Sequence, residues 1–166
     1  MAPRVILVGP PGAGKTTVGR QVSATLDIGF RDTDADVEEA SGRAVSEVFV
    51  DFGEEHFRNL ERTAVSRALA EHDGVLALGG GAVLDPRTRA DLGGYRVVFL
   101  DVGFACAARR IGLDRSRPLI ADNPRAQLRR LLEERLPLYR EIAAVTVSTD
   151  DRSVESVAAD VLAALQ

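Results

Sequence analysis

The chain has 166 residues, of which 45% are hydrophobic and 28% charged, and its formal net charge is −4. This length suits one compact domain spanning residues 1–166, and the composition is ordinary for a soluble globular protein. The negative charge argues against broad binding to nucleic acid or membranes, and no apolar stretch reaches membrane-spanning length.

The chain contains one cysteine, Cys106, so it cannot form an intramolecular disulfide. The first residues, MAPRVILVG, hold an apolar run that is too short for a signal peptide. We therefore expect a cytoplasmic protein, and we expect it to act as a monomer on small molecules.

Short apolar runs alternate with longer helical patterns along the whole chain. The expected strands are residues 4–8, 29–32, 75–78, 96–100 and 145–148. The expected helices are residues 14–26, 35–40, 45–52, 54–70, 87–92, 104–110, 124 to about 143, and 154–165. This alternation predicts an α/β fold with a parallel sheet, in which ligands bind at the carboxyl ends of the strands.

Residues 9–16 read GPPGAGKT and match the phosphate-loop pattern G-x-x-x-x-G-K-[ST] between the first strand and the first helix. The glycines let the backbone wrap closely around phosphate, and the helix N-terminus adds positive dipole. Lys15 should reach the β- and γ-phosphates, and the Thr16 hydroxyl should bind Mg²⁺. The alternative is a glycine-rich turn that only caps a helix, but such a turn would rarely match the whole pattern by chance.

Lys15 is the only lysine among the 21 lysine and arginine residues. A GC-rich genome explains the shortage of lysine, but not the position of the one that is left. We hypothesise that arginine, with its bulkier planar fork, does not fit this loop. Because guanine-nucleotide switches need an N-K-x-D segment, which a chain with this single lysine lacks, adenine is the expected base.

Two acidic residues, Asp32 and Asp34, end the second expected strand. On an extended segment, residues two apart point the same way, so both carboxylates could face one pocket. One would lie beside Mg²⁺ and the other beside the acceptor hydroxyl. The alternative is that either residue caps the helix that follows.

Six segments together resemble the shikimate kinase family: GPPGAGKT (9–16), DTD (32–34), FGEEHFR (52–58), LGGGAV (78–83), RSRPL (115–119) and RLPLYR (135–140). The resemblance implies a three-layer P-loop fold with a five-stranded parallel sheet in the order 2-3-1-4-5. It also implies a lid at about 112–122 and a substrate-binding region at about 33–61. The implied reaction moves the γ-phosphoryl group of ATP to the 3-hydroxyl of shikimate, a step of the shikimate pathway towards chorismate and the aromatic amino acids.

The resemblance also implies residue roles. Residues that would hold shikimate are Asp34, Phe49, Phe57, Arg58, Gly79, Gly80, Gly81 and Arg135. Residues that would bind the nucleotide are Gly12, Ala13, Gly14, Lys15, Thr16, Thr17, Arg110, Arg117 and Arg152. Mg²⁺ would bind Thr16 directly and Asp32 through water, and the catalytic residues would be Lys15, Asp34 and Arg117.

Other interpretations of the same residues stay open. The chain could be another small-molecule kinase of the same fold, such as a gluconate kinase, or a regulatory module that binds nucleotide without catalysis. Arg58 and Glu61, one helical turn apart, could form an ordinary surface pair. His56 and His72 are interpreted as helix-surface residues, and Cys106 as part of the core.

Overall fold

The computed structural model describes residues 2–113 and 123–166, and in them five parallel strands form one sheet in the order β2-β3-β1-β4-β5. The strands are β1 (Val5–Val8), β2 (Phe30–Asp32), β3 (Val75–Ala77), β4 (Val97–Asp101) and β5 (Val145–Ser148). Both the strand order and the parallel direction confirm the prediction from the sequence.

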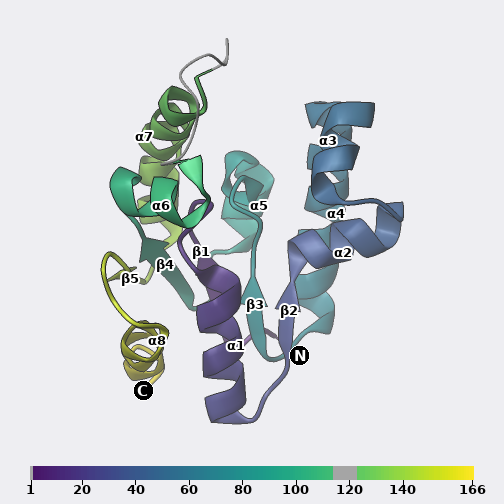
Figure 1. Cartoon of the computed structure of the whole chain (residues 1–166). Coiled ribbons are helices and arrows are strands. Elements are labelled where there is room, and N and C mark those ends of the chain that lie inside the picture. Colours follow the sequence, from purple (N-terminus) through teal and green to yellow (C-terminus); the bar gives the residue numbers. More distant parts are fainter. Residues whose placement is uncertain (1, 114–122) are drawn as a thin grey trace.

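Helices cover both faces of this sheet (Figure 1). They are α1 (Lys15–Leu26), α2 (Thr33–Ser41), α3 (Val45–Phe52), α4 (Glu54–Glu71), α5 (Pro86–Asp91), α6 (Phe104–Arg110), α7 (Pro124–Ile142) and α8 (Val154–Ala163), with a short 3₁₀ turn η1 (Ala82–Leu84). The 3₁₀ turn was not predicted. The other elements exist as expected, with ends that differ by at most a few residues.

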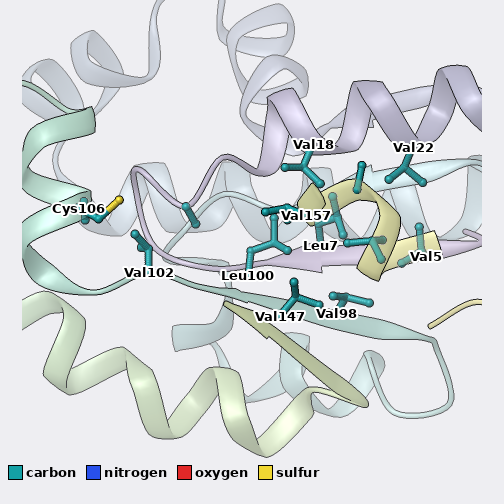
Figure 2. Packing of buried hydrophobic residues seen from close by; sticks show 14 of the residues in the cluster. Val5, Leu7, Val18, Val22, Val98, Leu100, Val102, Cys106, Val147 and Val157 are labelled. Carbon is teal, nitrogen blue, oxygen red and sulfur yellow. The ribbon is translucent and has the colours of Figure 1, made fainter. Parts of the chain in front are cut away.

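The central strand β1 is buried on both faces, which is why its sequence is continuously apolar. Val5 and Leu7 pack with α1 and α8 on one face, while Ile6 and Val8 pack with α4 and the end of α7 on the other. Figure 2 shows the first cluster, in which Val18 of α1 lies over β1. Cys106 belongs to this cluster, as predicted.

Helices α2, α3 and α4 build a smaller core of their own on the β2 side of the sheet (Figure 1). Its buried residues are Val37, Val48, Phe57 and Ala64. This arrangement holds α2 and α4, which carry several of the predicted site residues, close to the carboxyl ends of β2 and β3. No helix in residues 2–113 and 123–166 is both long and apolar enough to cross a bilayer.

One histidine does not lie where it was expected. Helix α4 ends at Glu71, and His72 follows it with an extended backbone. The His72 ring is partly buried, with Nε2 3.0 Å from the carbonyl oxygen of Val75. The interpretation of His72 as a helix-surface residue is therefore wrong, because the ring joins the end of α4 to β3.

Candidate active site

The phosphate loop leaves β1 and enters α1 through glycines that no other residue could replace without strain. Gly14, directly before α1, has a φ of 90°, in the left-handed region that favours glycine. A methyl group on Gly9 would lie 2.6 Å from the carbonyl oxygen of Leu100, so the loop runs tightly against β4. The predicted strand–loop–helix context of GPPGAGKT is confirmed.

Lys15 folds back over its own loop. Its ammonium donates to the carbonyl oxygens of Gly9, at 2.6 Å, and Pro10, at 3.1 Å. Although the residue as a whole stays partly exposed, burial of the ammonium lowers the pKa of Lys15 to about 8, against the opposing effect of Asp34 and Asp32. The cation therefore lies inside the loop and near both predicted carboxylates.

This pKa predicts a pH dependence of nucleotide binding. Phosphate oxygens need Lys15 in its charged form, which dominates below a pKa of about 8 and is lost above it. The affinity for ATP should therefore fall about twofold between pH 7 and 8 and about a further fivefold between pH 8 and 9, as measured by calorimetry. A Lys15→Arg variant, which stays charged, should show no such fall, and a flat wild-type profile up to pH 9.5 would contradict the prediction.

Asp32 joins the phosphate loop to α2. Its carboxylate accepts from the Thr16 hydroxyl at 3.0 Å and from the backbone N–H of Asp34 at 2.9 Å, so it also caps α2. The interpretation of Asp32 as a helix cap is therefore confirmed, and its second carboxylate oxygen contacts Thr16 at the start of α1. The segment itself is not extended as expected, because α2 begins at Thr33, and Asp34 lies in its first turn.

Thr16 and Asp32 fit Mg²⁺ by their chemistry and placement. Mg²⁺ prefers oxygen ligands and is usually held by one or two protein groups together with substrate phosphates. The 3.0 Å contact between the Thr16 hydroxyl and the Asp32 carboxylate places two such oxygens side by side at the entrance to α1. They lie where a nucleotide in the phosphate loop would bring its phosphates.

Asp34 is half-buried in a region, called the cleft below, that is bounded by the phosphate loop, α2, α4 and residues 79–81. Burial, with the nearby charge of Asp32, raises the pKa of Asp34, while Lys15 and Arg58 oppose the rise. A carboxyl group with a raised pKa is a better proton acceptor than an ordinary surface carboxylate. Asp34 thus lies within electrostatic reach of both Lys15 and Arg58.

The glycine segment, residues 79–81, closes the floor of this cleft. The Asp34 carboxylate lies directly against Gly79, and the Arg58 guanidinium lies directly against Gly81. In both cases a side chain on the glycine would occupy the space of the charged group. Close approach, and not a plain loop, therefore explains these two glycines.

Arg135, on α7, reaches the same segment from the other side. A methyl group on Gly80 would lie 3.4 Å from Arg135 Nη1 and 3.4 Å from the carbonyl oxygen of Gly9 in the phosphate loop. The positive charge of Arg135 also acts on Lys15 and Glu61. The structure thus brings Arg135 into the cleft that Lys15 and Gly80 share.

A Gly81→Ala substitution should disturb acceptor binding without unfolding the protein. Gly81 has a φ of −95°, which alanine adopts freely, but its methyl group would lie 2.5 Å from Arg58 Nη2. The guanidinium must then move, and we expect the KM for an acceptor that binds Arg58 to rise about tenfold. Steady-state kinetics and a melting curve test this; an unchanged KM would contradict it.

Arg58 and Glu61 do form an ion pair, but it is not the ordinary surface pair that was considered. Glu61 is only 3% exposed, and its carboxylate lies 2.8 Å from Arg58 Nη1. Burial raises the pKa of Glu61, and the charge of Arg58 opposes that rise. The Arg58 guanidinium also lies 5.1 Å from the ring centre of Phe57 and 6.0 Å from that of Phe49. A buried carboxylate and two aromatic rings thus hold Arg58 in place.

A pocket also lies beside the phosphate loop, on the side where adenine is expected. Arg110 donates to the carbonyl oxygen of Gly12 at 2.9 Å and to that of Thr149 at 2.6 Å, which ties the phosphate loop to the turn after β5. Arg152 donates to Ser148 and pairs with Asp160. A pocket of about 210 Å³ is lined by Ala13, Gly14, Thr17, Val18, Arg110, Thr149, Arg152, Ser153, Val154 and Val157.

A family model for shikimate kinase matches residues 11–166. The chain belongs to the shikimate kinase family. It is 56% identical to the shikimate kinase of Thermobifida fusca (strain YX), over 94% of this chain and 91% of that one. It is 55% identical to the shikimate kinase of Salinispora arenicola (strain CNS-205), over 99% of both chains.

Solved structures agree with this family membership. The shikimate kinase from Acinetobacter baumannii in complex with shikimate is 36% identical, with a TM-score of 0.88 over 98% of this chain and 91% of that one. A gluconokinase from Sinorhizobium meliloti 1021 has a TM-score of 0.62 at 19% identity, over 97% of this chain and 90% of that one. The second likeness shows a shared fold only.

Not every predicted site residue can be placed in this member of the shikimate kinase family. Arg117 and most of the expected lid lie in residues 114–122, outside the described residues. Conversely, three buried residues that contact the cleft were not predicted as site residues: Thr33, Glu61 and Tyr139. Their only sequence signal is position, because each lies within one helical turn of a predicted residue.

Proposed function

We propose that this chain phosphorylates the 3-hydroxyl of shikimate with ATP and releases shikimate 3-phosphate and ADP. The observation that carries the proposal is the arrangement around residues 79–81, where Asp34, Arg58 and Arg135 meet across the cleft from Lys15. A cation in a phosphate loop faces a carboxylate and two guanidinium groups. That combination suits a nucleotide on one side and an anionic polyol on the other.

The acceptor carboxylate binds Arg58 and Arg135, whose guanidinium groups can each donate two parallel hydrogen bonds. Glu61 keeps Arg58 in position on its far side, through the 2.8 Å ion pair. The rings of Phe49 and Phe57, 5.4 Å apart, line the cleft beside Arg58 and pack against the carbon ring of the acceptor. Gly80 offers backbone groups at the cleft floor.

Asp34 accepts a hydrogen bond from the 3-hydroxyl and directs its oxygen towards the γ-phosphorus. A bond forms between that oxygen and the phosphorus, the bond from the phosphorus to the ADP oxygen breaks, and Asp34 accepts the hydroxyl proton. The raised pKa of Asp34 favours this last transfer. Because the transition state is loose, orientation of the hydroxyl contributes more than its deprotonation.

Lys15 stabilises the charge that spreads over the phosphoryl oxygens during transfer. Thr16 would hold Mg²⁺ directly and Asp32 would hold it through water, and the ion would supply further neutralisation together with ATP. Arg117 would add a guanidinium from the lid. Gly12, Ala13, Gly14 and Thr17 would contact the phosphates, and adenine would occupy the pocket that Arg110 and Arg152 line. We further propose that the protein works as a monomer in the cytoplasm, where ATP is available.

A coupled assay of ADP release tests the proposal with shikimate, gluconate and no acceptor in parallel, each with Mg²⁺. We expect release that depends on shikimate, with mass spectrometry showing one added phosphoryl group. Turnover with gluconate and none with shikimate would assign another kinase of this fold. ATP binding without acceptor-dependent release would instead indicate a nucleotide-binding module.

A further inference from the structure

Two buried hydroxyl groups hold the glycine segment, residues 79–81, from opposite sides. The Thr33 hydroxyl oxygen accepts the backbone N–H of Gly79 at 3.0 Å. The Tyr139 hydroxyl donates to the carbonyl oxygen of Gly80 at 2.6 Å. Both contacts join residues that are far apart in the sequence, 46 and 59 positions respectively.

Neither hydroxyl can exchange its partner for bulk water. Thr33 is 0% and Tyr139 is 1% exposed, and the Tyr139 ring stacks on Phe99 of β4 with a centroid distance of 5.0 Å. Burial raises the pKa of Tyr139 to about 12, so its hydroxyl keeps the proton that it donates. A buried hydrogen bond of this kind is costly to remove, because the carbonyl it satisfies is then left without a partner.

Each hydroxyl belongs to a helix that also carries a charged residue of the site. Thr33 precedes Asp34 at the start of α2, and Tyr139 lies one turn beyond Arg135 on α7. A hydrogen bond from each helix to the same glycine segment therefore fixes Asp34 and Arg135 relative to Gly80. In residues 2–113 and 123–166, these are the two hydrogen bonds that join the segment to α2 and α7.

We propose that Thr33 and Tyr139 are positioning residues, which set the affinity for the acceptor by fixing the glycine segment between α2 and α7. This inference rests on the proposed function and names two residues that contact neither the acceptor nor the nucleotide. Their effect should fall mainly on acceptor binding, because β1 and α1 fix the backbone of the phosphate loop, which meets the glycine segment beside Gly80. If the two hydroxyl groups only stabilised the fold, removing them would not change the KM for shikimate more than the KM for ATP.

The first test is Tyr139→Phe, which removes the hydroxyl and keeps the ring. We expect the KM for shikimate to rise about five- to tenfold, the KM for ATP to stay within twofold, and the fold to remain intact. Tyr95→Phe, at the only other tyrosine, is the matched control and should leave both constants unchanged. Ser23→Ala removes another buried hydroxyl, which donates to Ile28 at 2.5 Å, and should lower the melting temperature only.

The second test separates the hydroxyl of Thr33 from its shape. Thr33→Val keeps the shape and removes the acceptor oxygen, so the KM for shikimate should rise as in Tyr139→Phe. Thr33→Ser keeps the oxygen and should restore the wild-type KM to within twofold. This rescue would not be expected if only packing of the methyl group mattered.

Three results would count against these assignments in different ways. Wild-type turnover that does not depend on shikimate refutes the proposed function, and the acceptor role with it. Normal wild-type turnover with an unchanged shikimate KM in Tyr139→Phe and Thr33→Val refutes the positioning role alone. Equal rises in the KM for shikimate and for ATP would show a general loss of structure, which also refutes it.

Discussion

A Lys15→Met variant should lose about a thousandfold in kcat while keeping its fold. The Lys15 ammonium is held by the carbonyl oxygens of Gly9 and Pro10, so it is already placed at the loop before phosphate arrives. A preorganised cation stabilises the transition state without the cost of reorganising at the moment of transfer. Methionine is an unbranched side chain one atom shorter than lysine, and it removes the charge together with the two hydrogen bonds to the loop.

Steady-state kinetics with saturating ATP and shikimate measure this loss. Lys15→Arg is the informative companion, because it restores the charge with a planar fork. We expect it to remain at least tenfold below wild type, since a guanidinium does not fit between the loop carbonyls. A Lys15→Arg variant with wild-type turnover would show that only the positive charge is needed, and it would refute the hypothesis that arginine does not fit this loop.

An Arg58→Ala variant should raise the KM for shikimate about a hundredfold and change the KM for ATP less than threefold. Charge-assisted bidentate hydrogen bonds to a carboxylate are among the strongest polar contacts in proteins. Arg58 faces the glycine segment, whereas the phosphate loop lies across the cleft. Its loss should therefore be specific to the acceptor, and kinetics with each substrate varied in turn measure the difference.

The same substitution also leaves Glu61 buried without its cation, which should lower stability by about 3–5 kcal/mol. The double variant Arg58→Ala/Glu61→Gln removes that unpaired charge and should recover much of the stability but none of the shikimate affinity. Arg62→Ala is the matched control, because Arg62 lies one turn further along α4 and points away from the cleft. Its guanidinium forms an ion pair with Asp91, at a distance of 2.6 Å. Equal weakening of shikimate and ATP by Arg58→Ala would contradict the assignment.

Much of the fold could be predicted from local signals. The apolar run at β1 and the GPPGAGKT loop that follows dictate a strand, a tight turn and a helix, and the structure has all three. The charged groups of Asp34 and Arg58 leave no room for a side chain on the segment between them. That requirement is visible in the sequence as three consecutive glycines, residues 79–81. Residues with such strong local requirements are the ones that a single sequence reveals.

The missed features depend on contacts between distant segments. Nothing in the sequence around Tyr139 shows that its hydroxyl meets Gly80, because that contact exists only once α7 packs against β4 and η1. Glu61 has the spacing of a surface pair with Arg58, and only the packing of α4 against its neighbours buries it. The start of α2 was misplaced for a local reason, since Asp32 caps the helix two residues earlier than the apolar pattern indicated.

Because Lys15 is the only lysine, the phosphate loop can be labelled selectively with a reagent that reacts with amines. Since the chain has one ε-amino group and its pKa is about 8, an amine-selective acylating reagent at mildly alkaline pH has a single side-chain target. Bound nucleotide would shield that target, so labelling of Lys15, resolved from labelling of the N-terminal amine by peptide mass spectrometry, becomes a readout of occupancy. A fluorophore or affinity tag could be attached there without first removing competing lysines by mutagenesis.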